Sequence, residues 1–148
     1  MFGLFALLCL PLCLPAQQNK LIIAPVNPLS VKRGASVTEP IKVVVLPGFH
    51  VNSDKPKDEF LIPLKLTWTD GPLKSETITY PKPEEIQVGG QNLVVFTGSF
   101  SIETKFSVPA NAPPGATTMT GKLHYQACNN QMCFRPGTLE VHVPVTVE

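Results

Sequence analysis

Apolar and polar residues alternate along most of this chain, which is the pattern of β-strands with one buried face. In the longest such run, Val94 to Val108, the even positions are mostly apolar and most odd positions are polar. Shorter runs with the same period are Phe60–Thr69, Thr117–Cys128 and Leu139–Val147. The long run predicts a strand that bends or switches sheets near Gly98.

Glycine- and proline-rich turns separate these runs, and no stretch of ten or more residues has the period of an amphipathic helix. The sequence predicts seven or eight strands, at Lys20–Val26, Ile41–Leu46, Phe49–Val51, Phe60–Thr69, Lys74–Tyr80, Leu93–Val108, Thr117–Cys128 and Leu139–Val147. We interpret Ile41–Leu46 as an apolar run and predict a central strand buried on both faces. The fold class that fits is all-β, an immunoglobulin-like antiparallel two-sheet sandwich.

Composition agrees with this fold class. The chain has 148 residues, enough for a single domain, and 16 of them are proline, which breaks helix interiors. The formal net charge is +1 and charged residues make up 16%, so we expect neither a nucleic-acid partner nor a solvated, disordered chain. Apolar residues, at 43%, supply a core.

Residues 2–16 form a separate apolar segment that ends at Ala16, before polar residues. This segment is shorter than the about 20 residues that cross a membrane, and it predicts a signal peptide at 1–16. Cys13 offers a lipid-attachment alternative, although Leu10-Pro11-Leu12 lacks the small residues usual before such a cysteine. We expect one mature domain at 17–148, without a transmembrane segment, in an oxidising compartment.

The candidate chemistry lies in a pair of cysteines, Cys128 and Cys133, separated by four residues between two predicted strands. Residues 129–132 would form the tip of a hairpin, and facing residues of a hairpin are close enough for a disulfide. The inward-facing residues of both flanking strands have odd numbers, so the numbers of two residues that face each other should add up to an even number. The numbers of Cys128 and Cys133 add up to an odd number. The sequence therefore predicts one extra residue beyond Cys133, at Pro136-Gly137, as a bulge.

Three interpretations of the pair stay open from the residues alone. A short ring near a loop tip suits thiol–disulfide exchange, but a disulfide that braces a recognition loop of a non-catalytic binding domain has the same spacing. A third interpretation is a Cu(I)-binding sandwich, whose soft ligands would be His124, Cys128, Met132 and Cys133. We expect His50 and His142 to be exposed surface residues, with nothing to connect them to Cys128.

Several segments together resemble the N-terminal periplasmic domain of the thiol:disulfide interchange protein DsbD, over most of residues 19–148. They are Gly48–Ser53, Pro63–Leu66, Pro113-Pro114-Gly115 and Gly121–Cys128 followed by Cys133 and Pro136. The most specific part reads Tyr-Gln-Ala-Cys-x4-Cys-x2-Pro. The resemblance implies an immunoglobulin-like sandwich whose two cysteines carry electrons by thiol–disulfide exchange in the periplasm.

The resemblance also implies roles for particular residues. Cys133 would attack a partner's disulfide and Cys128 would resolve the mixed disulfide, with no cofactor other than the cysteine pair. The supporting residues would be Tyr125, Gln126, Phe134, Arg135, Pro136, Phe49 and His50. Arg135 would favour the thiolate, and Phe49 and His50 would lie close to the cysteines. The partners would be thioredoxin-like periplasmic proteins, and the chain, if active, would be a component of a protein-disulfide reductase.

The sequence departs from this family in three ways. Four residues separate the cysteines, where the best-known members have five. The family shields its cysteines with a loop that contains Asp-Glu-Phe, but Asp58-Glu59-Phe60 occurs too early here and is interpreted as the start of a strand. A shielding segment is instead expected within Tyr80–Val94. The sequence ends at Glu148 without membrane segments or a thioredoxin-like domain, so we expect a separate membrane electron donor.

Overall fold

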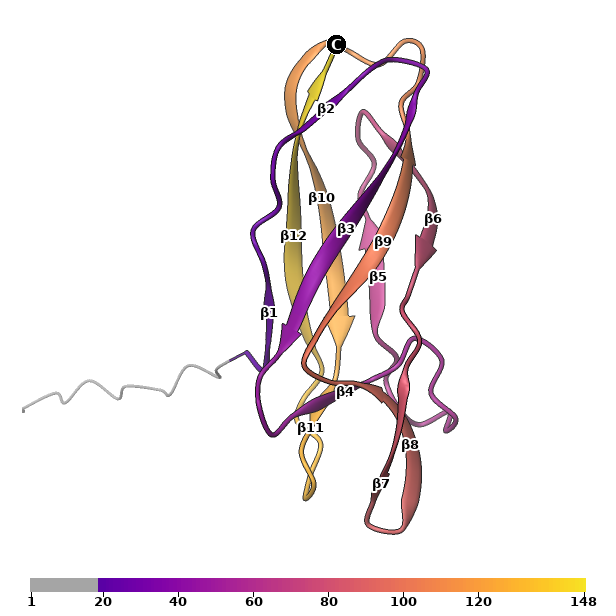
Figure 1. The fold of residues 1–148 in the computed structure, drawn as a ribbon, viewed down its shortest axis with the longest axis vertical. Coiled ribbons are helices and arrows are strands. Elements are labelled where there is room, and N and C mark those ends of the chain that lie inside the picture. The colour runs from indigo at the N-terminus through magenta and orange to yellow at the C-terminus, as the bar shows by residue number, and fades with distance from the viewer. Residues whose placement is uncertain (1–18) are drawn as a thin grey trace, which may run out of the picture.

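The computed structural model describes residues 19–148, so the predicted signal peptide at 1–16 lies outside the described residues. This part of the chain is all-β and contains twelve strands (Figure 1). They are β1 (Leu21–Ile23), β2 (Leu29–Val31), β3 (Ser36–Val45), β4 (His50–Asn52), β5 (Lys65–Trp68), β6 (Lys74–Thr79), β7 (Glu84–Val88), β8 (Gln91–Phe96), β9 (Ser99–Ser107), β10 (Gly115–Tyr125), β11 (Ala127–Cys128) and β12 (Gly137–Val147). Among these residues no helix is long and apolar enough to cross a membrane.

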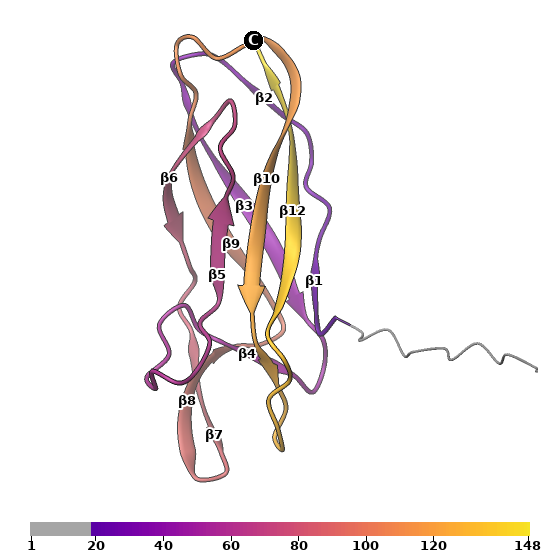
Figure 2. The ribbon, with the colours of Figure 1, turned by 180° about the vertical axis from the view of Figure 1, so that it is seen from behind.

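The strands form three four-stranded sheets. Two long sheets, β1-β3-β9-β6 and β2-β12-β10-β5, form the body of the sandwich, and the smaller sheet β11-β4-β8-β7 lies at the end away from the C-terminus (Figures 1 and 2). All strand pairs are antiparallel except β2 with β12, which is parallel. The all-β immunoglobulin-like class is confirmed. The numbers of sheets and strands were underestimated, because the structure has three sheets and twelve strands where two sheets and seven or eight strands were predicted.

The core forms where the predicted inward faces of the two long sheets meet. Ile102 and Phe106 on β9, and Val141 and Val143 on β12, have no exposed surface. Trp68 on β5 reaches across the sandwich to Phe106 on β9, with their ring centroids 4.9 Å apart in an edge-to-face arrangement. The Trp68 indole N–H donates to the Thr104 hydroxyl over 3.1 Å, so the polar atom that this contact buries is satisfied. The period-2 pattern therefore identified the core correctly.

The long alternating run does switch sheets where it was expected to. Gly98, with φ +59°, lies between β8, which belongs to the small sheet, and β9, which belongs to a long sheet. A left-handed backbone conformation is one that glycine adopts without the steric cost that a Cβ would add. The chain thereby connects the body of the sandwich directly to the small sheet.

Three of the strand predictions were wrong in detail. The strand predicted from Phe60 begins only at Lys65, because Asp58 caps a turn by accepting the Phe60 N–H over 2.9 Å and Pro63 has no N–H to pair. The strand predicted at residues 20–26 ends at Ile23. After two prolines the chain continues as β2, which belongs to the other long sheet. Residues 41–46 are not buried on both faces, since Lys42 is exposed.

Glu39 on β3 makes the stability of the sandwich depend on pH. This side chain is 9% exposed, and burial raises the pKa of its carboxyl above the ordinary 4.5. A raised pKa in the folded state means that protonation stabilises the fold, so stability falls as the pH rises through that range. We expect Glu39→Gln to raise the free energy of unfolding at pH 7 by roughly 1 kcal/mol. The gain should shrink as the pH falls through the raised pKa and be absent below the ordinary value of 4.5.

Chemical denaturation at several pH values measures this effect. Glu103→Gln, on the exposed face of neighbouring β9, is the matched control and should change stability little at any pH. A Glu39→Gln variant that is less stable than the parent protein at neutral pH would show that the carboxylate is stabilised by its surroundings instead.

Candidate functional site

The two predicted cysteines form a disulfide at the tip of a hairpin. Cys128 is the last residue of β11, it pairs with Cys133 as an isolated antiparallel bridge, and their Cα atoms are 4.0 Å apart. The four residues between them form a tight turn, in which the Asn129 N–H donates to the Met132 carbonyl over 2.9 Å. The Asn129 side-chain oxygen accepts the backbone N–H groups of Gln131 and Met132, each over 2.8 Å. The predicted hairpin tip is confirmed.

The register changes by one residue just beyond this tip. In the ladder between β10 and β12, Tyr125 pairs with Gly137, whereas Cys128 pairs with Cys133. Two residues separate Tyr125 from Cys128, and three residues, 134–136, separate Cys133 from Gly137. The predicted extra residue is confirmed, and it lies within 134–136, immediately before Gly137.

Two hydrogen bonds hold this irregular segment against the opposite strand. The Phe134 N–H donates to the Ala127 carbonyl over 2.8 Å, and the Gln126 amide donates to the Phe134 carbonyl over 3.2 Å. Gln126 thus has a defined place beside the cysteines, where it fixes the position of the residue that follows Cys133.

The two cysteines differ sharply in exposure. Cys128 is 2% exposed, whereas Cys133 is exposed, as is its neighbour Met132 at 56%. A partner's sulfur can therefore approach Cys133 from solvent and cannot approach Cys128 without an opening of the hairpin. The segment 80–94, expected to shield the pair, instead forms β7 and most of β8, a second hairpin beside the first, and it leaves Cys133 uncovered (Figure 1).

His50 lies directly across β4 and β11 from Cys128, in register. It is 4% exposed, its Nε2 has no hydrogen-bond partner among the described residues, and burial lowers the pKa of the imidazole from 6.5. The expectation that His50 is a surface residue unconnected to Cys128 was therefore wrong. The resemblance, which implied that Phe49 and His50 lie near the cysteines, located this histidine correctly.

An aromatic cluster adjoins the same hairpin. The rings of Phe49 and Phe134 meet edge to face, with centroids 5.8 Å apart. The Lys20 ammonium lies 4.8 Å from the Phe49 centroid and 5.4 Å from the Phe134 centroid, distances typical of cation–π contacts. Nothing in the sequence indicated a role for Lys20, because this residue lies far from the cysteine motif along the chain.

A cavity of about 270 Å³ opens beside this aromatic cluster. Its lining residues are Asn19, Lys20, Tyr125, Ala127, Phe134, Arg135, Pro136 and Gly137. Burial raises the pKa of Tyr125, and a hydrogen bond with the Lys20 backbone partly offsets that effect. A Cβ on Gly137 would lie 3.0 Å from the Tyr125 ring, so any larger residue at this position would have to displace the ring slightly. Arg135 is exposed at the rim.

The other histidines lie away from the disulfide. His124 pairs with Thr138 on one side of β10 and with Lys65 on the other, and its Nδ1 is 3.0 Å from the Thr138 hydroxyl. His142 is exposed, as expected, 3.2 Å from Glu140. Within residues 19–148, no group of three or more His, Cys, Asp or Glu side chains could hold a metal ion.

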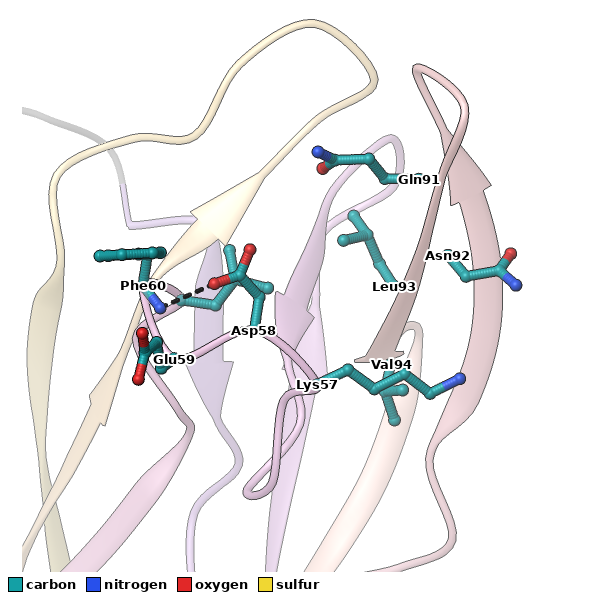
Figure 3. Close-up of a pocket in the computed structure, with 9 residues that line it drawn as sticks. Lys57, Asp58, Glu59, Phe60, Gln91, Asn92, Leu93 and Val94 are labelled. Carbon is teal, nitrogen blue, oxygen red and sulfur yellow. Dashed lines mark hydrogen bonds between the residues drawn. The ribbon is translucent and has the colours of Figure 1, made fainter.

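The loop that carries Asp58-Glu59-Phe60 borders a second cavity, of about 470 Å³, between residues 57–61 and 91–94 of β8 (Figure 3). Leu93 points toward the loop, whereas Phe60 turns away from β8 and is 85% exposed. Lys57 forms an exposed ion pair with Glu85 of β7 over 3.3 Å. The loop belongs to the β7–β8 side of the small sheet and contributes no residue to the cavity beside the cysteines.

Fold and site together define an immunoglobulin-like β-sandwich domain with a disulfide on a protruding, half-exposed hairpin. The family described as "Thiol:disulfide interchange protein DsbD, N-terminal" matches residues 18–144. The chain belongs to this family. No curated protein matches the chain.

Solved structures support the same fold at low sequence identity. The N-terminal periplasmic domain of ScsB from Proteus mirabilis matches with a TM-score of 0.56 and 15% identity, covering 76% of this chain. The chain spans 42% of the length of that ScsB chain. A chain of a type I cohesin–dockerin complex from Clostridium thermocellum matches with a TM-score of 0.50 and 13% identity, over 88% of this chain and 100% of that one. These likenesses concern the fold.

Proposed function

We propose that this domain relays electrons by thiol–disulfide exchange through Cys128 and Cys133, between a reductase partner and thiol proteins of the periplasm. The observation that carries the proposal is the unequal exposure of the two cysteine residues on one hairpin, with Cys133 exposed and Cys128 2% exposed. Exchange through a mixed disulfide needs one accessible sulfur for the partner and a second, protected sulfur that resolves the intermediate. Membership of the DsbD N-terminal family supports the same chemistry.

The reaction proceeds in two exchanges. The Cys133 thiolate attacks one sulfur of a partner's disulfide, which forms a mixed disulfide and releases the partner's other sulfur as a thiolate that takes up a proton. Cys128 then attacks the Cys133 sulfur, and the bond from Cys133 to the partner breaks. The cysteine pair loses two electrons and the partner gains two, and the reverse sequence recharges the domain from a dithiol donor.

The surroundings of Cys133 suit a protein partner. Exposed Met132 precedes it, and Phe134 and Pro136 follow it beside the cavity. We propose thioredoxin-like periplasmic proteins as the oxidised partners and a separate membrane protein as the electron donor. We also propose a periplasmic location, reached through a signal peptide at 1–16. Membership of the family supports the periplasmic location, as does the similarity to the N-terminal periplasmic domain of ScsB.

The reduction potential of the cysteine pair tests this function. Equilibration in glutathione or dithiothreitol buffers, followed by thiol trapping and mass spectrometry, should give a value in the range of exchange proteins, roughly −120 to −270 mV. A value below about −300 mV is typical of structural disulfides and would mean that the pair braces a recognition loop of a binding domain.

A further inference from the structure

His50 is a buried polar group that the two exchanges described above do not use. It is 4% exposed, and its Nε2 makes no hydrogen bond within residues 19–148. A buried polar atom without a hydrogen-bond partner destabilises the fold, so most such atoms have one. The residue opposite His50 in the β4–β11 ladder is Cys128. Paired residues of antiparallel strands share a face, with Cβ atoms about 4.5–5.5 Å apart.

Cys128 is also the cysteine that most needs a proton acceptor. Its attack on the mixed disulfide requires the thiolate, and burial disfavours a thiolate. Because Cys128 is 2% exposed, bulk water has little access to its sulfur to remove the proton. The resolving step therefore calls for a base inside the protein, on the face that Cys128 shares with β4.

We propose that His50 accepts the thiol proton of Cys128 as Cys128 resolves the mixed disulfide, an inference that rests on the proposed exchange function. The S–H bond of Cys128 breaks and its proton moves to Nε2, while the Cys128 sulfur forms its bond to Cys133. The bond between Cys133 and the partner breaks, and its electron pair leaves on the partner's sulfur. The imidazolium returns the proton to solvent or to that sulfur, which restores neutral His50.

The surroundings of His50 favour the neutral form that can accept a proton, and burial lowers its pKa below the ordinary 6.5. The residues that pair with β4 are Ala127, Cys128, Val95 and Phe96. Of these, Cys128 is the titratable one. Asn52, two residues along the same face, is uncharged, while the nearest acidic residue along the chain, Asp54, lies beyond β4 and acts on Tyr80. The Lys20 ammonium lies 4.8 Å from the ring centroid of Phe49, the residue before His50, and is the cation nearest to this strand in the interactions described above.

The aromatic disulfide DTNB separates the two exchanges. In the reduced domain, attack by Cys133 releases one coloured thiolate, and resolution by Cys128 releases the second. We expect His50→Gln to slow the second release roughly tenfold at pH 7, because a thiol of ordinary pKa is only a few per cent ionised there. The first release should change less than about twofold, since Cys133 is exposed and needs no internal base.

His142→Gln is the matched control, because His142 is an exposed histidine on β12, nine residues beyond Cys133. It should leave both releases unchanged. An unchanged second release in His50→Gln would overturn the role of His50 while leaving the exchange function intact. Absence of the first release from the unmodified protein would overturn both, because then Cys133 does not exchange.

The pH profile of the second release distinguishes a proton acceptor from a packing role. In the unmodified protein the rate should fall as the pH drops through the His50 pKa, below 6.5, because an imidazolium cannot accept a proton. In His50→Gln the rate should instead follow the thiolate fraction, about tenfold per pH unit. Parallel profiles in the two proteins would contradict the proposal.

If His50→Gln does not fold, NMR titration of the unmodified protein decides the question. Proton sharing with Cys128 requires that His50 titrate at a different pH in the reduced domain than in the oxidised one, by linkage. Identical His50 titrations in the two redox states would overturn the inference.

Discussion

Replacing Cys128 with serine should turn this domain into a trap for its partners. The variant keeps the exposed Cys133 thiol, which forms a mixed disulfide, but lacks the sulfur that resolves it. We expect a disulfide-linked species with an oxidised thioredoxin-like protein to persist on a non-reducing gel for Cys128→Ser. The unmodified protein should pass through the same species without accumulating it.

Cys133→Ser is the matched variant, because it leaves only the buried sulfur. Its thiol should react with DTNB at least about a hundredfold more slowly than that of Cys128→Ser, since reaction requires the hairpin to open. In denaturant the two variants should react at similar rates, which shows that the difference comes from the fold. Equal rates for the two folded variants would contradict the division of roles between the sulfurs.

The largest expected loss of stability follows from Phe106→Ala. Phe106 is fully buried on β9 and contacts the Trp68 ring across the sandwich. Removing a buried phenylalanine costs about 3–5 kcal/mol through lost burial and the cavity left behind. This is a large share of the about 5–15 kcal/mol that typical domains have, and it should lower the melting temperature by roughly 10–20 °C. Calorimetry or thermal circular dichroism measures the change.

Phe60→Ala makes the same chemical change on the surface. Because Phe60 is 85% exposed, we expect the melting temperature to stay within about 2 °C of the parent value. A comparable loss for both variants would mean that the Trp68–Phe106 contact does not anchor the core in the way that its burial indicates.

The body of the sandwich could be predicted because one rule, alternation of buried and exposed positions, applies along β9, β10 and β12. The rule failed where other effects decide the backbone. At Phe60 the Asp58 cap and Pro63 override an apolar alternating pattern. Strand β7, and with it the β7–β8 hairpin, was missed because Pro81, Pro83 and charged residues surround it. Gly89-Gly90 was interpreted as a turn, but no strand was predicted before it.

The cysteine pair and its register could be predicted from spacing and parity alone. The position of His50 could not, because cross-strand neighbours far apart in sequence depend on which strands pair. The β4–β11 pairing involves two residues on each strand, too few to leave a pattern in the sequence. The place of Lys20 over two aromatic rings is likewise a consequence of tertiary packing, and a single lysine carries no signal for it.

The extra residue within 134–136 separates the register of the disulfide hairpin from that of β12. A change of one residue in an antiparallel strand normally turns every following side chain to the other face. Here the irregular segment lies outside the ring closed by the disulfide and before Gly137, where the regular ladder with β10 begins. A change in the length of the tip should therefore leave β12 in register, with Val141 and Val143 still in the core.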